Sequence, residues 1–139
     1  MGYKHLFIDS DIILDMLVTR KPFSMYAEML LEEKKLSGIT LSTSTLIIAN
    51  INYILTKAIG KPEAKESVKR ITNLLEIFSF EKDAIESALS GAFTDFEDAI
   101  ENHIALKHKC DVIITRNIKD YKQATIPVLT AEQFLRTIL

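Results

Sequence analysis

The order of apolar and polar positions along the chain predicts strands that alternate with helices. The runs at residues 3–8 and 112–114 end in continuous apolar or β-branched side chains, which is typical of strands buried on both faces of a parallel sheet. In the run at residues 76–80 apolar and polar positions alternate, which also indicates a strand. The predicted strands cover residues 3–8, 39–41, 76–80, 112–114 and 127–129.

Segments with apolar side chains at three- and four-residue spacing lie between these strands and predict helices. Their ends carry helix signals, such as Pro22 at a first helical position, Gly38 after a last one, and Thr94 as an N-cap with Glu97 three residues later. The predicted helices cover residues 12–18, 22–36, 45–58, 62–75, 83–90, 95–109 and 131–138. Such a chain folds as a three-layer α/β/α sandwich around a mostly parallel sheet of about five strands.

Composition narrows the class of protein. The 139 residues carry 47% hydrophobic and 26% charged side chains, with no linker-like stretch, so we expect one domain over residues 1–139. A net charge of −2 excludes a strongly cationic, non-specific nucleic-acid binder but not a nucleic-acid enzyme with a local basic rim. The single cysteine, Cys110, excludes an internal disulfide and a cysteine-built zinc site. No signal-like or membrane-spanning run is present, so we expect a cytoplasmic protein that does not enter a membrane.

Two carboxylates, Asp9 and Asp11, come directly after the first strand. In open α/β sheets the ligand crevice lies beyond the carboxyl ends of the strands, so a site is expected there. Two neighbouring carboxylates need a cation between them or a retained proton. Alternatively one of them is the N-cap of the following helix, and Asp11 is favoured over Asp9 for that role. Asp15 follows Asp11 by one helical turn, and we interpret it as a solvated surface acid.

A second acidic cluster opens the helix that precedes the strand at residues 112–114. Asp95, Asp98 and Asn102 share one face and form a polar strip. With Glu97, this segment has three acids in four residues, which is more than helix capping requires. His103 is interpreted as a core histidine rather than a metal ligand. The apolar face that should meet the sheet consists of Phe96, Ala99, Ile100, Leu106 and Cys110.

Two more polar elements complete the candidate set. Thr115, Arg116 and Asn117 follow the strand at residues 112–114 and should share an edge of the sheet with Asp9; Asp120 further on reads as a surface residue. Asn50 lies among apolar residues in the middle of a helix, where its amide requires either a structural hydrogen bond or a place at the site.

These stretches together resemble a PIN domain, the fold of VapC-type toxin ribonucleases. They are FIDSDIILD, TLIIANINYIL, DFEDAIENHIAL, DVIITRNIKDY and IPVLT, and they span essentially the whole chain. The resemblance implies a parallel sheet between helices, with acids that hold Mg²⁺ or Mn²⁺ for endonucleolytic cleavage of RNA. The family's first-strand acid falls on Asp9, and the acid that opens the helix before the fourth strand falls on Asp98.

The sequence departs from the family pattern at two positions. The middle-helix acid, usually Glu, is Asn50, and the acid after the threonine, usually Asp, is Asn117, with Asp120 as a substitute nearby. Each departure removes a negative charge from the expected metal site. Asp11, at a position commonly filled by Asn, restores one.

The resemblance also implies roles and partners. Asp9 and Asp98 are expected as direct metal ligands, Asp95 and Asp11 as direct or water-mediated ligands, and Asn50 and Asn117 as groups that position water. The partners expected are an RNA substrate, an antitoxin protein and a second copy in a homodimer. The substrate-binding residues expected are Thr115, Arg116 and Lys119, with Lys122, Arg20 and Lys21 in a basic rim.

Two rival functions remain at this point. Asp9-Ser10-Asp11 also matches the signature of haloacid-dehalogenase-type phosphatases, with Asp9 as nucleophile and Asp11 as general acid. That pattern further requires an acidic pair at a later strand end, whereas Asp95 and Asp98 precede their strand. The other rival is a PIN-like domain that binds RNA or a protein partner without cleavage, favoured by the two asparagines.

Overall fold

The protein is built on one five-stranded sheet in which every neighbouring pair of strands is parallel. The computed structural model describes residues 2–18 and 21–138. The strand order is β3-β2-β1-β4-β5, and its register pairs Phe7 with Ser42 on one side and with Ile113 on the other. The strands are β1 (His5–Ile8), β2 (Thr40–Ser44), β3 (Glu76–Phe78), β4 (Val112–Ile114) and β5 (Val128–Leu129).

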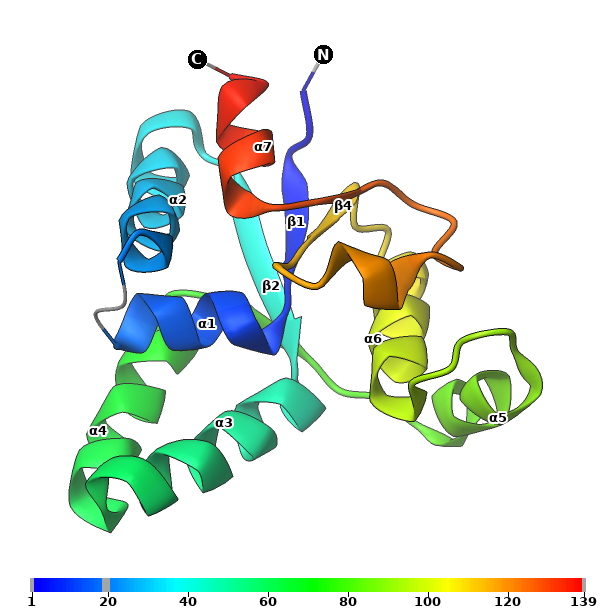
Figure 1. Ribbon diagram of the computed structural model, residues 1–139, viewed down its shortest axis with the longest axis horizontal. Helices are drawn as coiled ribbons and strands as arrows, with labels where there is room; N and C mark the ends of the chain where they lie inside the picture. The colour runs from blue at the N-terminus through cyan, green and yellow to red at the C-terminus, as the bar shows by residue number, and fades with distance from the viewer. Residues whose placement is uncertain (1, 19–20, 139) are drawn as a thin grey trace.

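Helices cover both faces of this sheet, which confirms the predicted three-layer α/β/α sandwich. In Figure 1, α1, α2 and α4 lie to the left of the sheet, and α5 and α6 lie to its right. The helices are α1 (Ser10–Leu17), α2 (Phe23–Ser37), α3 (Thr45–Ile59), α4 (Lys61–Thr72), α5 (Lys82–Ser90), α6 (Phe96–Lys107) and α7 (Ala131–Arg136), with a 3₁₀-helix η1 (Ile118–Tyr121). No helix among the described residues is long and apolar enough to cross a bilayer.

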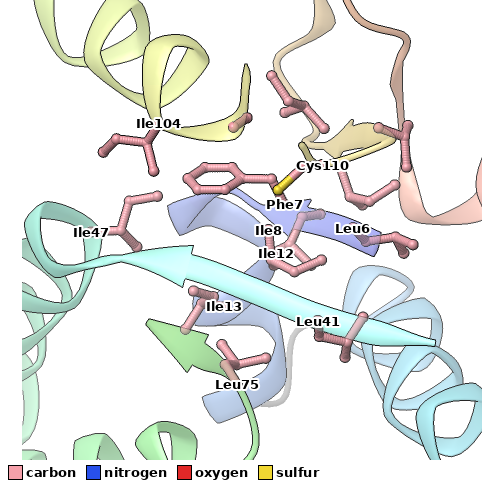
Figure 2. Close-up of a cluster of buried hydrophobic side chains, with 14 of the residues drawn as sticks. Leu6, Phe7, Ile8, Ile12, Ile13, Leu41, Ile47, Leu75, Ile104 and Cys110 are labelled. Atoms are coloured by element: carbon pink, nitrogen blue, oxygen red, sulfur yellow. The ribbon is translucent and has the colours of Figure 1, made fainter. Parts of the chain in front are cut away.

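The core is organised around β1, which lies at the centre of the sheet. Leu6, Phe7 and Ile8 are all fully buried, as the continuous apolar run predicts. Figure 2 shows the Phe7 ring pointing toward Ile104 of α6. Successive side chains of a strand point to opposite faces, so this short strand anchors the helices on both sides.

The second strand is longer than predicted, because its polar residues satisfy their hydroxyl groups inside the sheet. Ser42 and Thr43 are fully buried, and their hydroxyls donate to the carbonyls of Leu6 and Ile8 at 3.0 and 2.9 Å. Ser44 ends the strand and caps α3, its hydroxyl accepting from the Ile47 N–H at 3.1 Å. Ser44 is therefore both the last residue of the strand and the cap of the following helix.

The predicted apolar face of α6 is wrong in part. Phe96 and Leu106 are 46% and 41% exposed, whereas Glu101 and Asn102 are buried. The helix therefore turns a partly polar face inward, next to the carboxyl ends of the strands. His103 is half-buried at the contact of α6 with α5, where its Nε2 lies 3.3 Å from Asp83 Oδ2, and is not a core residue.

Candidate metal centre

The carboxyl ends of β1, β2 and β4 form one edge of the sheet, and the candidate site lies along it. The N–H of Asp9 donates to the carbonyl of Ile114 at 3.0 Å, so the ends of β1 and β4 are level with one another. Strand order reverses at β1, since β2 and β3 lie on one side of it and β4 and β5 on the other. Ligand crevices form at such switch points in open α/β sheets.

Asp9 is buried and both of its carboxylate oxygens are held in place. Its exposure is 6%. Oδ1 accepts from the N–H of Ser10 at 2.8 Å, which makes Asp9 rather than Asp11 the N-cap of α1, and Oδ2 accepts from the Thr115 hydroxyl at 2.8 Å. Burial raises the pKa of Asp9, against the lowering effect of these hydrogen bonds. The carboxylate is therefore fixed in position but poorly solvated.

Asp11 lies one residue into α1 and reaches the turn after β4. Its Oδ2 accepts from the N–H of Arg116 at 3.0 Å, with the Thr115 hydroxyl at 3.4 Å. Its other oxygen, Oδ1, is buried and has no hydrogen-bond partner. Burial and then the charge of Asp9 raise the pKa of Asp11 to about 6. Asp11 thus has one oxygen free to accept a ligand.

The start of α6 brings Asp98 toward Asp9, as the sequence predicts. Burial, followed by the charges of Asp9, Asp95 and Asp120, raises the pKa of Asp98 to about 7. Asp95 is the N-cap of α6, and its Oδ1 accepts from the N–H of Asp98 at 2.8 Å. The prediction of Thr94 as the cap is wrong, because the helix begins one residue later.

Two residues that sequence reasoning missed, Glu101 and Tyr121, also lie beside these acids. Both are 2% exposed. Burial, opposed by the Ser44 hydroxyl and reinforced by the charges of Asp9 and Asp98, raises the pKa of Glu101 to about 8. The Tyr121 hydroxyl lowers the pKa of Asp9 and Asp98 yet has no hydrogen bond of ordinary geometry. The spacing of three residues from Asp98 was the one available signal for Glu101.

The two asparagines at usually acidic positions lie on the rim. Asn50 is half-buried rather than enclosed by apolar residues, and its Nδ2 donates to Glu97 Oε1 at 3.2 Å, joining α3 to α6. Asn117 is exposed, and its backbone N–H donates to the Thr115 hydroxyl at 3.0 Å. Asn50 therefore finds the structural hydrogen bond that its position required.

The basic side chains divide into one that is paired and several that face solvent. The Arg116 guanidinium forms a two-point contact with Asp15, Nε to Oδ2 at 3.0 Å and Nη2 to Oδ1 at 3.2 Å, and lies 4.1 Å from the centre of the Phe23 ring. Asp15 is 2% exposed, so its interpretation as a surface acid is wrong. Lys21, Lys119 and Lys122 are exposed, and Arg20 lies outside the described residues.

The donor set fits a hard divalent cation such as Mg²⁺ or Mn²⁺. Asp9, Asp11 and Asp98 supply carboxylate oxygens, and Asp11 Oδ1 is buried without a partner. In the described part of the chain, no group of three or more His, Cys, Asp or Glu side chains is arranged to hold a metal ion. An ion at this edge would therefore be held directly by one or two carboxylates, as Mg²⁺ commonly is, with water as the remaining ligands.

Comparison with known proteins decides the family. Residues 5–119 match the model of the PIN domain. The chain belongs to the PIN domain family. This membership confirms the predicted fold. It argues against the alternative of a haloacid-dehalogenase-type phosphatase.

Individual proteins resemble nearly the whole of the chain. Ribonuclease VapC1 of Aquifex aeolicus (strain VF5) is 30% identical over 139 residues, which cover 96% of this chain and 95% of that protein. The structure of FitAcB from Neisseria gonorrhoeae gives a TM-score of 0.71 at 14% identity and covers 91% of this chain and 98% of its own. A toxin–antitoxin complex from Klebsiella pneumoniae gives 0.66 at 21% identity, with 91% and 97% covered. The two structures share the fold of this chain.

Proposed function

We propose that this PIN domain is a divalent-metal-dependent endoribonuclease and the toxin component of a toxin–antitoxin pair that acts in the cytoplasm. The observation that carries the proposal is the meeting of Asp9, Asp11 and Asp98 at the switch point of the sheet, where each has a raised pKa. Burying several carboxylates side by side is unfavourable unless they have a cation to hold or a proton to retain. The full-length similarity to Ribonuclease VapC1 supports the same activity.

Asp9 and Asp98 would hold Mg²⁺ or Mn²⁺ directly, with Asp11 and Asp95 as direct or water-mediated ligands. When bound, such an ion acidifies a water for attack on a phosphodiester and neutralises charge on the phosphate. Thr115 fixes Asp9 for this role through its 2.8 Å hydrogen bond, and the Arg116 N–H fixes Asp11 at 3.0 Å. The chain thus orients its acids before any substrate arrives.

The remaining polar groups would bind RNA and orient water. Lys119, with Lys122 and Lys21, faces solvent and would meet phosphates, as a basic rim does. Arg116 would contact a phosphate only with the part of its guanidinium that Asp15 leaves open, since the side chain is 26% exposed. Asn117, exposed beside Thr115, and Asn50 would position water through their amides.

The partners proposed are an antitoxin protein and a second copy of the chain. The Klebsiella pneumoniae structure of this fold is a toxin–antitoxin complex, which supports an antitoxin. A small gene immediately upstream, whose product co-purifies with this protein and suppresses its RNase activity, is the expected finding. Sedimentation of the protein alone should show a dimer.

The proposal is tested by cleavage of RNA in the presence of Mn²⁺ or Mg²⁺. Wild-type protein should cut, EDTA should abolish cutting, and Asp9→Asn should lose at least about 100-fold in rate, since it removes a charged ligand while keeping the shape of the side chain. A phosphatase substrate run alongside should remain intact. Cleavage that survives both EDTA and Asp9→Asn would contradict the proposal.

A second candidate function is RNA binding without cleavage. It is favoured by Asn50, whose amide is occupied by Glu97 at 3.2 Å and adds no negative charge to the site. Under this alternative the protein shifts the mobility of RNA, and neither Mn²⁺ nor Mg²⁺ at millimolar concentration produces fragments.

A further inference from the structure

Glu101 is a buried carboxylate that the proposed ligand set does not use. It lies in α6 one turn beyond Asp98, on the inward face of the helix, and is 2% exposed. The carboxyl approaches the Ser44 hydroxyl at the end of β2 and is close enough to Asp9 and Asp98 for their charges to act on it. Its carboxyl therefore lies within electrostatic reach of the acids at the switch point.

The surroundings of Glu101 lack the compensation that a buried carboxylate requires. Its Oε1 has no hydrogen-bond partner, and no salt bridge in the described part of the chain includes this residue. Buried carboxylate oxygens are normally paired, so an unpaired one beside several acids points to a positively charged ligand.

We propose that Glu101 is a metal-holding residue, whose carboxylate in the middle of α6 contacts, directly or through a bound water, the divalent cation held by Asp9 and Asp98. The inference rests on the proposed function, because it assigns a further ligand to the same metal centre. The alternative is a permanently protonated Glu101 that fills space in the core. A neutral glutamine, which has the same size, distinguishes the two.

The test is the binding of Mn²⁺ alone, measured by calorimetry and by the electron paramagnetic resonance signal of the free ion at a fixed neutral pH. Glu101→Gln should weaken Mn²⁺ binding by roughly 10- to 100-fold. Asp98→Asn serves as the positive control. Glu66→Gln, which changes an exposed carboxylate on α4 in the same way, should bind Mn²⁺ as the wild type does.

Each outcome separates the inference from the function on which it rests. If wild-type protein binds no Mn²⁺, the proposed metal centre itself fails. If wild type binds and Glu101→Gln binds equally well, the metal centre stands and the role of Glu101 is overturned. The melting temperature in EDTA completes the test: Glu101→Gln should melt no lower than wild type, because the amide has the size of the carboxyl and cannot ionise in the core. A variant that unfolds in EDTA would assign the carboxylate to folding and would also overturn the inference.

Discussion

Thr115, at the end of β4, is hydrogen-bonded through its side chain to Asp9 at the end of β1. Its hydroxyl donates to Asp9 and accepts from the N–H of Asn117, and its backbone N–H donates to the Leu129 carbonyl at 3.0 Å. A threonine at this point keeps one oxygen of Asp9 in a fixed direction. Without that hydroxyl, Asp9 would still be buried and would keep its hydrogen bond from the Ser10 N–H, but its Oδ2 would lose the donor that fixes it.

Replacing Thr115 with valine should therefore affect the reaction more than the fold. We expect Thr115→Val to lower the RNA cleavage rate by roughly 10-fold, since groups that orient metal ligands commonly contribute that much. The free energy of unfolding should fall by roughly 1 to 3 kcal/mol, because Asp9 Oδ2 and the Asn117 N–H each lose a partner. Single-turnover cleavage and urea denaturation measure the two effects.

Thr43→Val is the matched control for this prediction. It removes another fully buried threonine hydroxyl, which donates to the Ile8 carbonyl at 2.9 Å rather than to an acid. It should cost about the same stability while cleavage proceeds at the wild-type rate. Equal rates for wild type and Thr115→Val would show that Asp9 needs no help from Thr115.

At the scale of single residues, the sequence predicts those site members that stand at the ends of elements. Asp9 and Asp98 each sit where a strand or helix boundary puts them at the sheet edge, and the structure brings them together. Glu101 could not be found in this way, because only the rotation of α6 on the sheet decides whether a mid-helix acid faces inward. The pairing of Asp15 with Arg116 depends likewise on residues 101 positions apart in the chain.

Among the elements, α6 carries the largest share of the candidate site. Asp95 caps it, Asp98 and Glu101 lie in its first two turns, and Asn50 of α3 is hydrogen-bonded to its Glu97. The Asp95 side chain accepts a hydrogen bond from the Asp98 N–H, one of the N–H groups that the start of a helix leaves unpaired. Asp95 therefore has both a structural role as the cap and a proposed role in metal binding.

The two roles of Asp95 can be separated by a pair of substitutions. Asp95→Asn keeps an oxygen that can accept from the Asp98 N–H, so its stability should match that of the wild type, whereas Asp95→Ala should lose about 1 kcal/mol. If Asp95 also holds the cation, both variants should bind Mn²⁺ more weakly. Thermal melts and Mn²⁺ titrations give the answer, and unchanged affinity in both variants would restrict Asp95 to capping.

The order and type of the long elements follow from hydrophobic periodicity, whereas their ends depend on tertiary contacts. The extension of β2 through Ser44 relies on hydroxyl bonds to β1, which no local pattern reveals. The short helix η1 has four residues, too few for a periodic signal, yet it places Tyr121 against the acids. Local propensity is a weak guide wherever packing supplies the missing partners.

For the whole molecule, the buried acids make stability depend on pH in a defined direction. Asp11, Asp98 and Glu101 have folded-state pKa values of about 6, 7 and 8, above their ordinary values of 3.8, 3.8 and 4.5. A carboxyl with a raised pKa stabilises the fold fully below its unfolded pKa, and that contribution is lost as pH rises through the folded value. In metal-free protein, stability should decline between about pH 4 and pH 8.

Below that pH window, carboxyls with a lowered pKa make the protein less stable as the pH falls. The N–H groups of Lys4 and His5 donate to Asp111 at 2.9 and 2.8 Å and lower its pKa, so its contribution is lost as pH falls. The melting temperature in EDTA should therefore pass through a maximum near pH 4. Saturating Mn²⁺ should flatten the decline toward pH 8, and Asp98→Asn should make it shallower without metal. A melting temperature that rises between pH 5 and pH 8 in EDTA would contradict this account.

The buried thiol next to β1 has a kinetic consequence. Cys110 is 5% exposed, packs close to Phe7 (Figure 2), and has a pKa raised by burial to about 11. Only an exposed thiolate reacts quickly with alkylating reagents, so modification has to wait until the centre of the sheet opens. As the chain has one cysteine, the labelling rate under native conditions counts openings of the sheet, with no probe to engineer. Bound Mn²⁺ should slow that rate by the same factor by which it stabilises the closed form.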